Sequence, residues 1–386
     1  IVDDGSGPEY GEVFQELRAL DPRVVVVEAT ENAGAYAARN LGVKRARGDY
    51  ITVQDDDDWA HAQKLEWLVA YLEDNPSLLA AVGSHVRFSE DGEFIRIGNR
   101  PQFSVPCYAA ILFRKRAFEE VGLWQEVRKA GDSELMERIQ AAQGVNIPVI
   151  GKAPPTLTRV AAGRLTSGEL NRGYIAPARR WYVSAYRRHR KAMGGEPLRT
   201  ASVPQGVPAA SLNRPGTKYR VDYLVCADYT HDCAATGEAL KRAAELVVGG
   251  FAVGLVHIES PIPLEASQGL PQVFDFLETN PDIPMLSYRE NASCSTAEVF
   301  GSSCVEYADS AQSRLSTEQA VVFVGGEGLI DGELPRPNLP RCVSNLKRLV
   351  GVAPTVQVRD ARVKEYLEAL GYGPLLGEGD GRGDGE

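Results

Sequence analysis

The chain has 386 residues, a net charge of −10 at pH 7 and 44% hydrophobic residues, which is the composition of an ordinary globular protein. The acidic balance argues against broad nucleic-acid binding, because that activity needs a basic surface that releases counterions. No apolar run approaches the ~20 residues that cross a bilayer, and a chain of this length is expected to form two domains.

The first half of the chain alternates strand and helix patterns, which is typical of a largely parallel α/β sheet. Helical spacing of apolar or alanine residues predicts helices at 10–20, 32–47 and 65–72, and another that opens near Asp132. Strands are expected at 24–27, 50–54 and 107–113, with a hairpin that turns at Asp91-Gly92.

The second half begins after a basic, aromatic helix at 175–191 and a segment rich in Gly, Pro, Ser and Ala. It repeats the α/β pattern, with strands expected at 219–226, 251–258, 320–324 and 355–358 and helices at 234–248 and 361–370. The predicted organisation is a first domain over 1–192, a linker over 193–217, a second α/β domain over 218–375 and a disordered tail over 376–386. Because the chain starts inside a strand-like motif, the first domain is expected to lack an upstream strand and helix.

Two strand-like runs end abruptly in aspartates, namely Asp3-Asp4 and Asp55-Asp56-Asp57-Asp58. Adjacent carboxylates repel one another, and the carboxyl ends of strands in an open α/β sheet line the ligand crevice. Mg²⁺ or Mn²⁺ takes one or two carboxylates and completes its shell with phosphate oxygens and water. The two runs therefore suggest a metal-dependent enzyme acting on a nucleotide diphosphate, whereas a solvated acidic turn is the structural alternative.

Further motifs follow these aspartates in a fixed order. They are Asn32-Ala33-Gly34, Ala38-Arg39-Asn40-Leu41-Gly42, Leu112-Phe113-Arg114-Lys115, Val121-Gly122-Leu123-Trp124 and Gly131-Asp132-Ser133-Glu134-Leu135. Over roughly residues 1–170 the sequence resembles the inverting family-2 glycosyltransferases of the GT-A fold. The resemblance implies a mostly parallel sheet sandwiched by helices, and the pattern of the second half favours a second, Rossmann-like α/β domain.

The resemblance also implies roles for the aspartates. Asp57 is the expected metal ligand, with Asp55 assisting. The donor nucleotide is expected to contact a set of residues that consists of Asp3, Asp4, Asn32, Arg39, Asp55 and Asp56. A carboxylate at Asp3 or Asp4 can accept the N3–H of uracil, so a UDP-sugar is the expected donor. An Asp-Gly-Ser turn is the alternative reading of Asp3 and Asp4.

Asp132 occupies the place of the general base in this family. Inverting transfer is a single displacement in which a carboxylate takes the proton of the acceptor hydroxyl. A position at a helix N-terminus favours the ionised carboxylate by ~0.3–1 kcal/mol, although aspartate is also a preferred N-cap residue. Glu134 is the alternative base. The chain has Gly131 before Asp132, where many relatives have glutamate.

The sequence thus predicts a metal-dependent inverting glycosyltransferase that moves a sugar from a nucleotide diphosphate to a glycan, lipid-linked or small-molecule hydroxyl. A non-catalytic nucleotide-sugar- or metal-binding protein and a nucleotidyltransferase with a similar sheet remain alternatives. A third is a catalytic centre in the second domain, where Asp228, His231, Asp232 and Cys233 follow a strand and His257 ends another.

The expected location is cytoplasmic, because the six cysteines show no metal-ligand or disulfide-framework spacing. The basic helix at 175–191 could add peripheral contact with an anionic membrane or a lipid diphosphate acceptor. Domain packing is the other reading of that helix.

Overall fold

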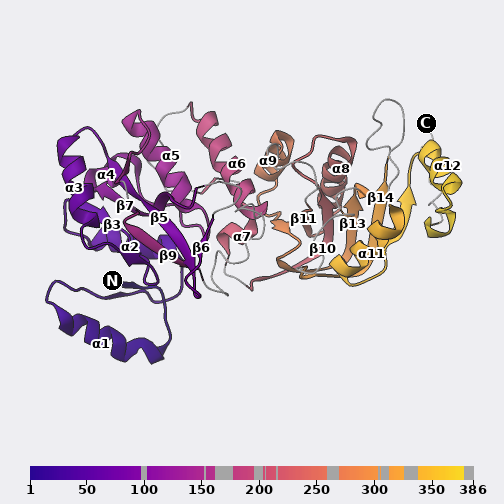
Figure 1. Ribbon diagram of the computed structural model, residues 1–386. Helices are drawn as coiled ribbons and strands as arrows, with labels where there is room; N and C mark the ends of the chain where they lie inside the picture. Colours follow the sequence, from indigo (N-terminus) through magenta and orange to yellow (C-terminus); the bar gives the residue numbers. More distant parts are fainter. Residues whose placement is uncertain are drawn as a thin grey trace. The chain divides into compact units, whose positions relative to one another are not determined.

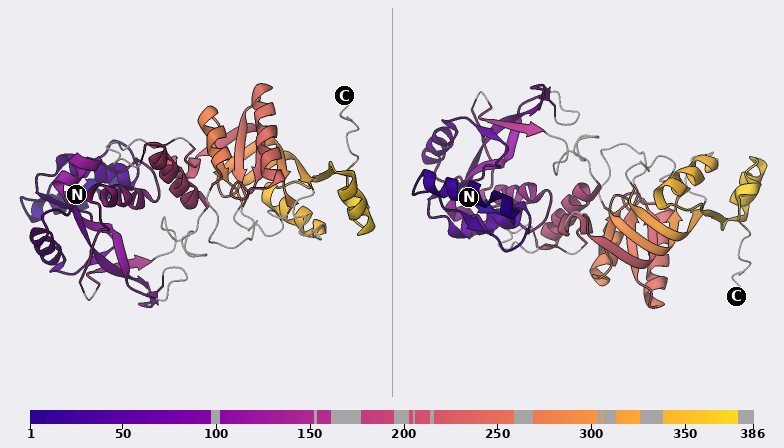
Figure 2. Two further views of the ribbon diagram at one scale, coloured as in Figure 1. Left: turned by 90° about the horizontal axis from the view of Figure 1, so that it is seen from above. Right: turned by 90° about the horizontal axis from the view of Figure 1, so that it is seen from below.

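The computed structural model describes residues 1–96, 102–151, 154–160, 177–194, 203–204, 206–213, 216–258, 269–302, 305, 313–325 and 338–377 (Figures 1 and 2). The chain divides into two compact units. Unit 1 comprises residues 1–179 and 186–204, and unit 2 comprises residues 180–185 and 205–386. The division at 204 falls inside the segment predicted as a linker. The segment predicted as a disordered tail lies, from residue 378 on, outside the described residues.

Unit 1 begins with a small parallel sheet of two strands, β1 (Val2–Asp3) and β2 (Val27–Glu28). A 3-10 turn, η1 (Pro8–Tyr10), and helix α1 (Gly11–Leu20) connect them. Helix α1 has no buried residue. The strand predicted at 24–27 corresponds to β2, which is shorter and begins three residues later.

The main sheet of unit 1 has seven strands. They are β3 (Tyr50–Thr52), β4 (Trp59–Ala60), β5 (Ala80–Ser89), β6 (Phe94–Ile95), β7 (Val105–Arg114), β8 (Val149–Ile150) and β9 (Thr156–Val160). Its central order is β3-β7-β5-β9-β4, and β6 and β8 also pair with β5. The predicted hairpin forms, with Phe88 opposite Phe94.

The prediction of a mostly parallel sheet is wrong in detail for unit 1. Strand β7 is antiparallel to both β3 and β5, and β4 is antiparallel to β9, whereas β8 and β9 are parallel to β5. The physical reason is the connection between β5 and β7, which contains the β6 hairpin strand and no crossover helix among its described residues. A parallel neighbour needs a crossover of a dozen or more residues, usually a helix.

Helices pack against this sheet: α2 (Ala35–Arg45), α3 (Lys64–Asp74), α4 (Lys115–Val121) and α5 (Gly131–Gln143) (Figure 1). Helix α3 buries Leu68 and Leu72 against Ala81 and Leu112 of the sheet. An aromatic cluster of Phe113, Phe118 and Trp124, with ring centroids 5.0–5.6 Å apart, joins β7, α4 and the loop before α5. These contacts fix the two segments, after β3 and at the start of α5, that carry the predicted site.

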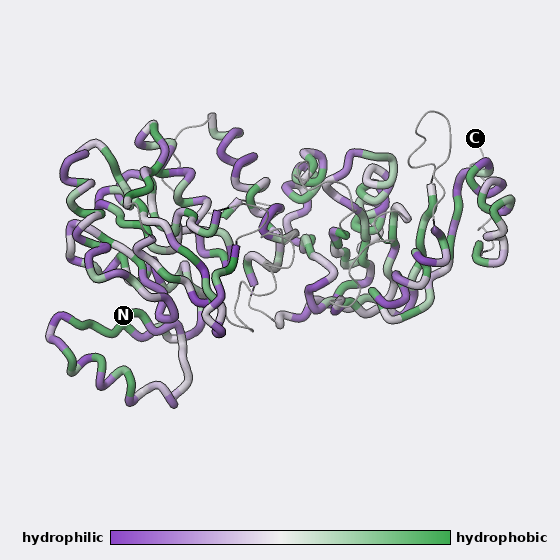
Figure 3. The backbone as a smooth tube through the Cα atoms, viewed as in Figure 1, coloured by the Kyte–Doolittle hydropathy of each residue, from purple (hydrophilic) through white to green (hydrophobic). Residues whose placement is uncertain are grey.

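Helix α6 (Pro177–Ala192) corresponds to the predicted basic helix. Figure 3 shows it as a largely hydrophilic segment. Residues 180–185 group with unit 2, and the rest of the helix groups with unit 1. On the unit 1 side, Arg187 and Arg190 both pair with Glu137 of α5, at 2.6 and 2.5 Å. Two of the arginines that suggested a membrane surface thus pair with a carboxylate of the same unit.

Unit 2 is a six-stranded, fully parallel sheet with the order β12-β11-β10-β13-β14-β15. The strands are β10 (Lys218–Ala227), β11 (Val253–His257), β12 (Met285–Ser287), β13 (Asn291–Phe300), β14 (Leu315–Val324) and β15 (Thr355–Val358). In chain order this is 3-2-1-4-5-6, the doubly wound arrangement of Rossmann sheets. The predicted Rossmann-like second sheet is therefore present.

The helices of unit 2 are α7 (Ala209–Leu212), α8 (Ala234–Val248), α9 (Pro271–Thr279), α11 (Leu339–Val350) and α12 (Ala361–Ala369), followed by the 3-10 turn η4 (Gly373–Leu375). Figure 2 shows α11 on the opposite face of the sheet from α8 and α9. With both faces covered, the central strands are buried and need apolar side chains. Strand β13 is an exception in composition, because its Glu298 is buried and accepts two hydrogen bonds from Arg242 at 2.9 Å.

Candidate active site

The four predicted aspartates form a turn directly after β3, closed by a hydrogen bond from the Asp58 amide to the Asp55 carbonyl at 3.2 Å. The Asp55 carboxylate pairs with Arg39 of α2 at 2.9 Å. Asp58 accepts hydrogen bonds from the Thr158 hydroxyl and the Arg159 amide of β9. Burial, together with the charge of Asp55, raises the pKa of the Asp58 carboxyl. Asp58 therefore anchors the turn to the sheet, while Asp55 faces α2.

The same turn offers hard oxygen ligands, the chemistry that Mg²⁺ and Mn²⁺ prefer. Asp57 is half-buried and Asp56 is exposed. Within the described residues, no group of three or more His, Cys, Asp or Glu side chains is arranged to hold a metal. A divalent cation at this turn would have one or two carboxylates as protein ligands and would need the rest of its ligands from a bound phosphate or water.

Of the two N-terminal aspartates, Asp4 accepts backbone hydrogen bonds with both carboxylate oxygens, and Asp3 accepts one with a single oxygen. The two Asp4 oxygens accept hydrogen bonds from the amides of Ala33 and Gly34, at 2.8 and 2.7 Å. One Asp3 oxygen accepts from the Ser6 amide at 2.8 Å, in the predicted Asp-Gly-Ser turn. Both aspartates thus hold backbone: Asp4 holds the loop that carries Asn32, and Asp3 holds the turn at Ser6.

Asn32 is itself held by Arg128, a residue that the sequence did not single out. The Arg128 guanidinium donates to the Asn32 side-chain oxygen at 2.9 Å and to its carbonyl at 3.3 Å. Gly34 has a φ of 98°, and a Cβ there would lie 2.7 Å from an Arg128 nitrogen. The positive φ therefore favours glycine at position 34, and a side chain there would also require the Arg128 guanidinium to shift.

Asp132 lies at the start of α5, in the same unit as the acidic turn. It is the second residue of the helix rather than its N-cap, since the N-cap is Ala130. Its Oδ1 accepts from the Tyr36 hydroxyl at 3.1 Å and from the Ser133 amide at 2.9 Å, and Arg179 lies 4.0 Å away. The side chain is 18% exposed. Asp132 is thus fixed in place but still reachable.

A line of contacts joins Asp132 to the acidic turn. Tyr36 bonds to Asp132, the guanidinium of Arg39 lies over the Tyr36 ring at 5.2 Å, and Arg39 pairs with Asp55. Burial, with the charge of Asp132, raises the pKa of the Tyr36 hydroxyl, so it remains a protonated donor. Residues 39, 55 and 132, predicted separately from the sequence, are therefore joined by one line of contacts.

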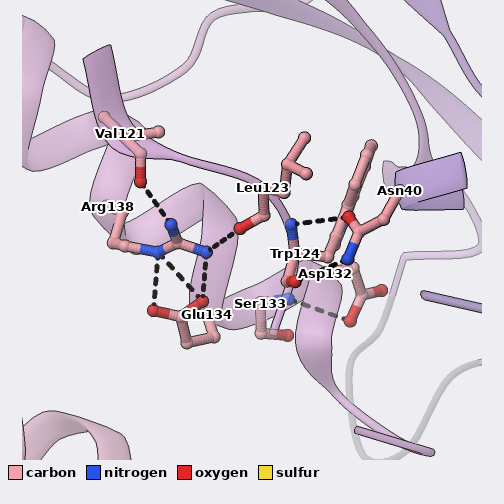
Figure 4. Close-up of polar contacts among 8 residues, drawn as sticks. All are labelled: Asn40, Val121, Leu123, Trp124, Asp132, Ser133, Glu134 and Arg138. Atoms are coloured by element: carbon pink, nitrogen blue, oxygen red, sulfur yellow. Dashed lines mark hydrogen bonds and ion pairs between the residues drawn. The ribbon is translucent and has the colours of Figure 1, made fainter. Parts of the chain in front are cut away.

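Glu134, the alternative base, lies on another side of α5 from Asp132 (Figure 4). It is 2% exposed and accepts three hydrogen bonds from the fully buried Arg138, at 2.7–3.0 Å. Arg138 also donates to the carbonyls of Val121 and Leu123. Burial raises the pKa of the Glu134 carboxyl, and the charge of Arg138 opposes that rise. The pair ties α5 to the preceding loop and leaves Glu134 unsuited to meet an acceptor.

Several polar residues of this region carried no readable signal in the sequence: Tyr36, Lys64, Arg128, Arg138 and Thr158. Lys64 is 3% exposed and donates to Gln54 at 3.2 Å, beside the acidic turn, and burial lowers the pKa of its ammonium group. The structure also places Gly131 against Tyr36. A Cβ at position 131 would lie 3.0 Å from two carbons of the Tyr36 ring, so a larger residue there would require the ring to shift.

In unit 2, the polar residues named from the sequence also lie at the carboxyl ends of strands. Asp228 follows β10, and its Oδ1 lies 3.8 Å from Nδ1 of His257, which ends β11. His257 accepts from the Tyr229 amide at 3.3 Å, and Asp228 accepts from the amide and hydroxyl of Thr230. Burial lowers the pKa of His257 to about 4. Both residues of the pair therefore contact the loop that follows β10, and the imidazole is neutral at neutral pH.

Among the described residues, no helix is long and apolar enough to span a membrane.

The chain was compared with known proteins. Residues 1–124 match the family model described as "Glycosyl transferase family 2". Glycosyltransferase GlyA of Streptococcus pneumoniae is 37% identical over 90 residues, which cover 23% of this chain and 13% of that protein. Glycosyltransferase GlyG of the same organism is 33% identical over 24% of this chain and 31% of its own length. The chain thus spans less than a third of these two relatives.

Solved structures with a partial likeness include Staphylococcus aureus TarS 1-349 in complex with UDP. That likeness has a TM-score of 0.32 and 16% identity, and it covers 42% of this chain and 50% of that one. Another is the mannosyltransferase PcManGT of Pyrobaculum calidifontis with GDP-Man and Mn²⁺, with a TM-score of 0.34, 19% identity and coverage of 50% and 54%. The family model covers the acidic turn, Tyr36 and Arg39. Residues 1–124 of the chain are thus similar to the family 2 glycosyltransferases.

Proposed function

We propose that the chain is a metal-dependent, inverting glycosyltransferase that moves a sugar from a nucleotide diphosphate donor to an acceptor hydroxyl. The observation that carries this proposal is the line of contacts from Asp55 through Arg39 and Tyr36 to Asp132. It brings the acidic turn of a family 2 domain and a carboxylate suited to general-base work into one site.

Asp132 would act as the general base. The acceptor oxygen attacks the anomeric carbon, its proton passes to the Asp132 carboxylate, and the bond from that carbon to the diphosphate oxygen breaks. The nucleoside diphosphate leaves with the electron pair of that bond. A positioned base contributes typically 10²–10⁴-fold to such a step.

Asp57, assisted by Asp55, would hold a Mg²⁺ or Mn²⁺ ion. A bound cation supplies neutralisation of the charge that develops on the departing diphosphate. Arg39 would keep Asp55 in position, because it is 12% exposed and already paired with that carboxylate. Asp56, which is exposed, would meet the donor from the solvent side of the turn.

Asp3, Asp4 and Asn32 would form the nucleotide end of the site. Asp3 has one oxygen engaged by the Ser6 amide, so the other is suited to the N3–H of uracil. Asp4 would act indirectly, through the loop amides that it holds. A UDP-sugar is the donor we expect on these grounds, with a glycan, lipid-linked or small-molecule hydroxyl as acceptor.

The test is a screen of nucleotide sugars for donor hydrolysis and transfer, with Mn²⁺, with Mg²⁺ and with chelator. We expect turnover with at least one UDP-sugar that is lost on chelation and restored by either ion. Asp132→Asn serves as the matched control, because it keeps the shape of the site. Metal-dependent binding without turnover would instead indicate a non-catalytic sugar-binding protein. Conversion of the nucleotide sugar to a nucleoside triphosphate and a sugar 1-phosphate, only when pyrophosphate is added, would indicate a nucleotidyltransferase.

A further inference from the structure

We infer that Tyr36 is the residue that positions the general base, by holding Asp132 through one carboxylate oxygen and leaving the other for the proton of the acceptor. The inference rests on the proposed function and assigns a task that neither the family match nor the sequence motifs give to this tyrosine. It follows from three features of the site: the contacts of Asp132, the packing of the Tyr36 ring and the glycine at position 131.

The first feature is that every contact described for the Asp132 carboxylate reaches the same atom. The Tyr36 hydroxyl, the Ser133 amide and the Arg179 guanidinium all face Oδ1, at 3.1, 2.9 and 4.0 Å. Among the described residues, none donates a hydrogen bond to Oδ2. A carboxylate fixed through one oxygen presents the second in a defined direction, which is what a general base within reach of its substrate requires.

The second feature is that Tyr36 comes from outside α5. The Ser133 amide belongs to the helix itself and moves with it, so it cannot fix Asp132 relative to the donor side of the site. Tyr36 lies on α2, next to Arg39, whose partner Asp55 belongs to the acidic turn. The Tyr36 hydroxyl therefore provides a hydrogen bond from the donor side of the site to the Asp132 carboxylate.

The ring of Tyr36 is itself held firmly. The residue is 7% exposed, a Cβ at position 131 would lie 3.0 Å from its ring, and the Arg39 guanidinium lies over it. Burial keeps the hydroxyl protonated. The terminal torsion of an aspartate is broad and soft, so an external donor of this kind is needed to select one orientation.

The third feature is the glycine beside the base. A Cβ at position 131 would lie 3.0 Å from Cδ2 and Cε2 of Tyr36 and 3.1 Å from a Val127 methyl group. Ala130, just before it, has a positive φ of 62°. In the described part of the chain it is the single residue other than glycine with a positive φ. Such strained backbone persists where the surroundings over-determine it. The start of α5 is thus shaped around the tyrosine ring.

The experiment is a double-mutant cycle on the single-turnover rate of transfer, with Tyr36→Phe, Gly131→Ala and the double variant. Tyr36→Phe keeps the ring and removes the hydroxyl, so we expect a rate lowered by about 10-fold, the lower end for a hydrogen bond to a charged group, with donor affinity within about twofold of the parent. Gly131→Ala keeps the hydroxyl but displaces the ring, so it should lower the rate similarly. Because both changes break one contact, the double variant should be close to either single variant rather than to their product.

Tyr50→Phe is the matched control, since it removes a tyrosine hydroxyl of the same unit that contacts Glu73 and Arg114 instead. Its transfer rate should equal that of the parent. If the parent is active, a Tyr36→Phe variant with the parent's transfer rate would overturn this inference but not the proposed function. Effects of the two changes that multiply fully in the double variant would do the same. A parent that transfers no sugar with any donor would overturn the proposed function and, with it, the role of Tyr36.

Discussion

The two sheets of this protein both end strands in aspartates, but they use them differently. In unit 1, Asp55 and Asp132 are held by residues from other segments, Arg39 and Tyr36, and the groups form one connected line. In unit 2, Asp228 is held by Thr230 of its own loop and by the neighbouring His257. The aspartates of unit 1 thus connect separate sequence motifs, whereas Asp228 contacts a residue of its own loop and the end of the adjacent strand β11.

The contrast recurs within a single helix turn. Asp132 and Glu134 are two residues apart on α5, yet one is fixed through a single oxygen and the other is closed off by a buried arginine. Buried ion pairs hold structure, whereas partly exposed carboxylates with one oxygen in reserve can do chemistry. The predictions below test whether each carboxylate belongs to the group we assign it to.

The largest expected effect is that of Asp132→Asn, which should lower turnover by ~10²–10⁴ while leaving donor affinity within a few-fold of the parent. The amide keeps the Oδ1 contacts but cannot take the acceptor proton. Single-turnover assays and calorimetric donor binding are the measurements. Near-parent turnover in this variant would place the base elsewhere, and Asp228 and His257 of unit 2 would be the next residues to change.

Glu134→Gln should show the opposite pattern. It removes the charged partner of a fully buried guanidinium, so we expect a loss of ~3–5 kcal/mol in the free energy of unfolding. Turnover per folded molecule should stay close to that of the parent. Denaturant unfolding and active-site titration together separate the two effects, and a dead but fully stable variant would contradict our assignment.

Asp57→Ala should abolish the part of donor binding that depends on Mg²⁺ or Mn²⁺, because it removes the expected metal ligand. Asp56→Ala is the matched control, an exposed neighbour in the same turn, and should weaken binding far less. Calorimetry with and without chelator measures both. Equal, metal-independent affinity in the parent and the Asp57 variant would reduce the acidic run to a structural turn.

A smaller effect concerns acid stability. Burial lowers the pKa of His257 in unit 2 and of His85 in unit 1 to about 4, against an ordinary value of 6.5. Between these values the unfolded chain binds a proton that the folded unit does not. Each histidine therefore contributes to the loss of stability as pH falls from about 6.5 to about 4, on the order of 3 kcal/mol.

Unfolding free energies measured across that pH range should fall less steeply in His257→Asn and His85→Asn than in the parent. The two variants change different units, so each should alter the slope of one unfolding transition. An unchanged slope in either variant would show that the histidine is already solvated in the folded unit.

The fold could be anticipated where local pattern and tertiary role agree. Helix α8 and strand β15 have the predicted bounds, because their apolar periodicity is the one that the doubly wound sheet buries. Strand β13 escaped prediction, since Ser, Thr and Glu are poor signs of a central strand and Glu298 is tolerated only because Arg242 pairs with it. The strand directions of unit 1 depended on connections that a list of elements does not specify.

The site could be anticipated only as separate motifs. Each predicted carboxylate belongs to a recognisable sequence motif. The residues that hold the site, Tyr36, Arg128 and Arg138, come from helices and loops where such residues are common. Which of two aspartates binds backbone and which stays open depends on angstrom-scale placement. The predictions for the site residues remain to be tested by the experiments above.

Asn40 shows how such placement limits which residues a position accepts. Its side-chain amide donates to the Trp124 carbonyl at 2.9 Å and accepts from the Trp124 amide at 3.0 Å. It thus acts as a detached peptide unit that pairs with a distant backbone as a neighbouring strand would. Aspartate lacks the donor and glutamine is one methylene too long, so neither could replace asparagine at position 40 and keep both hydrogen bonds to Trp124.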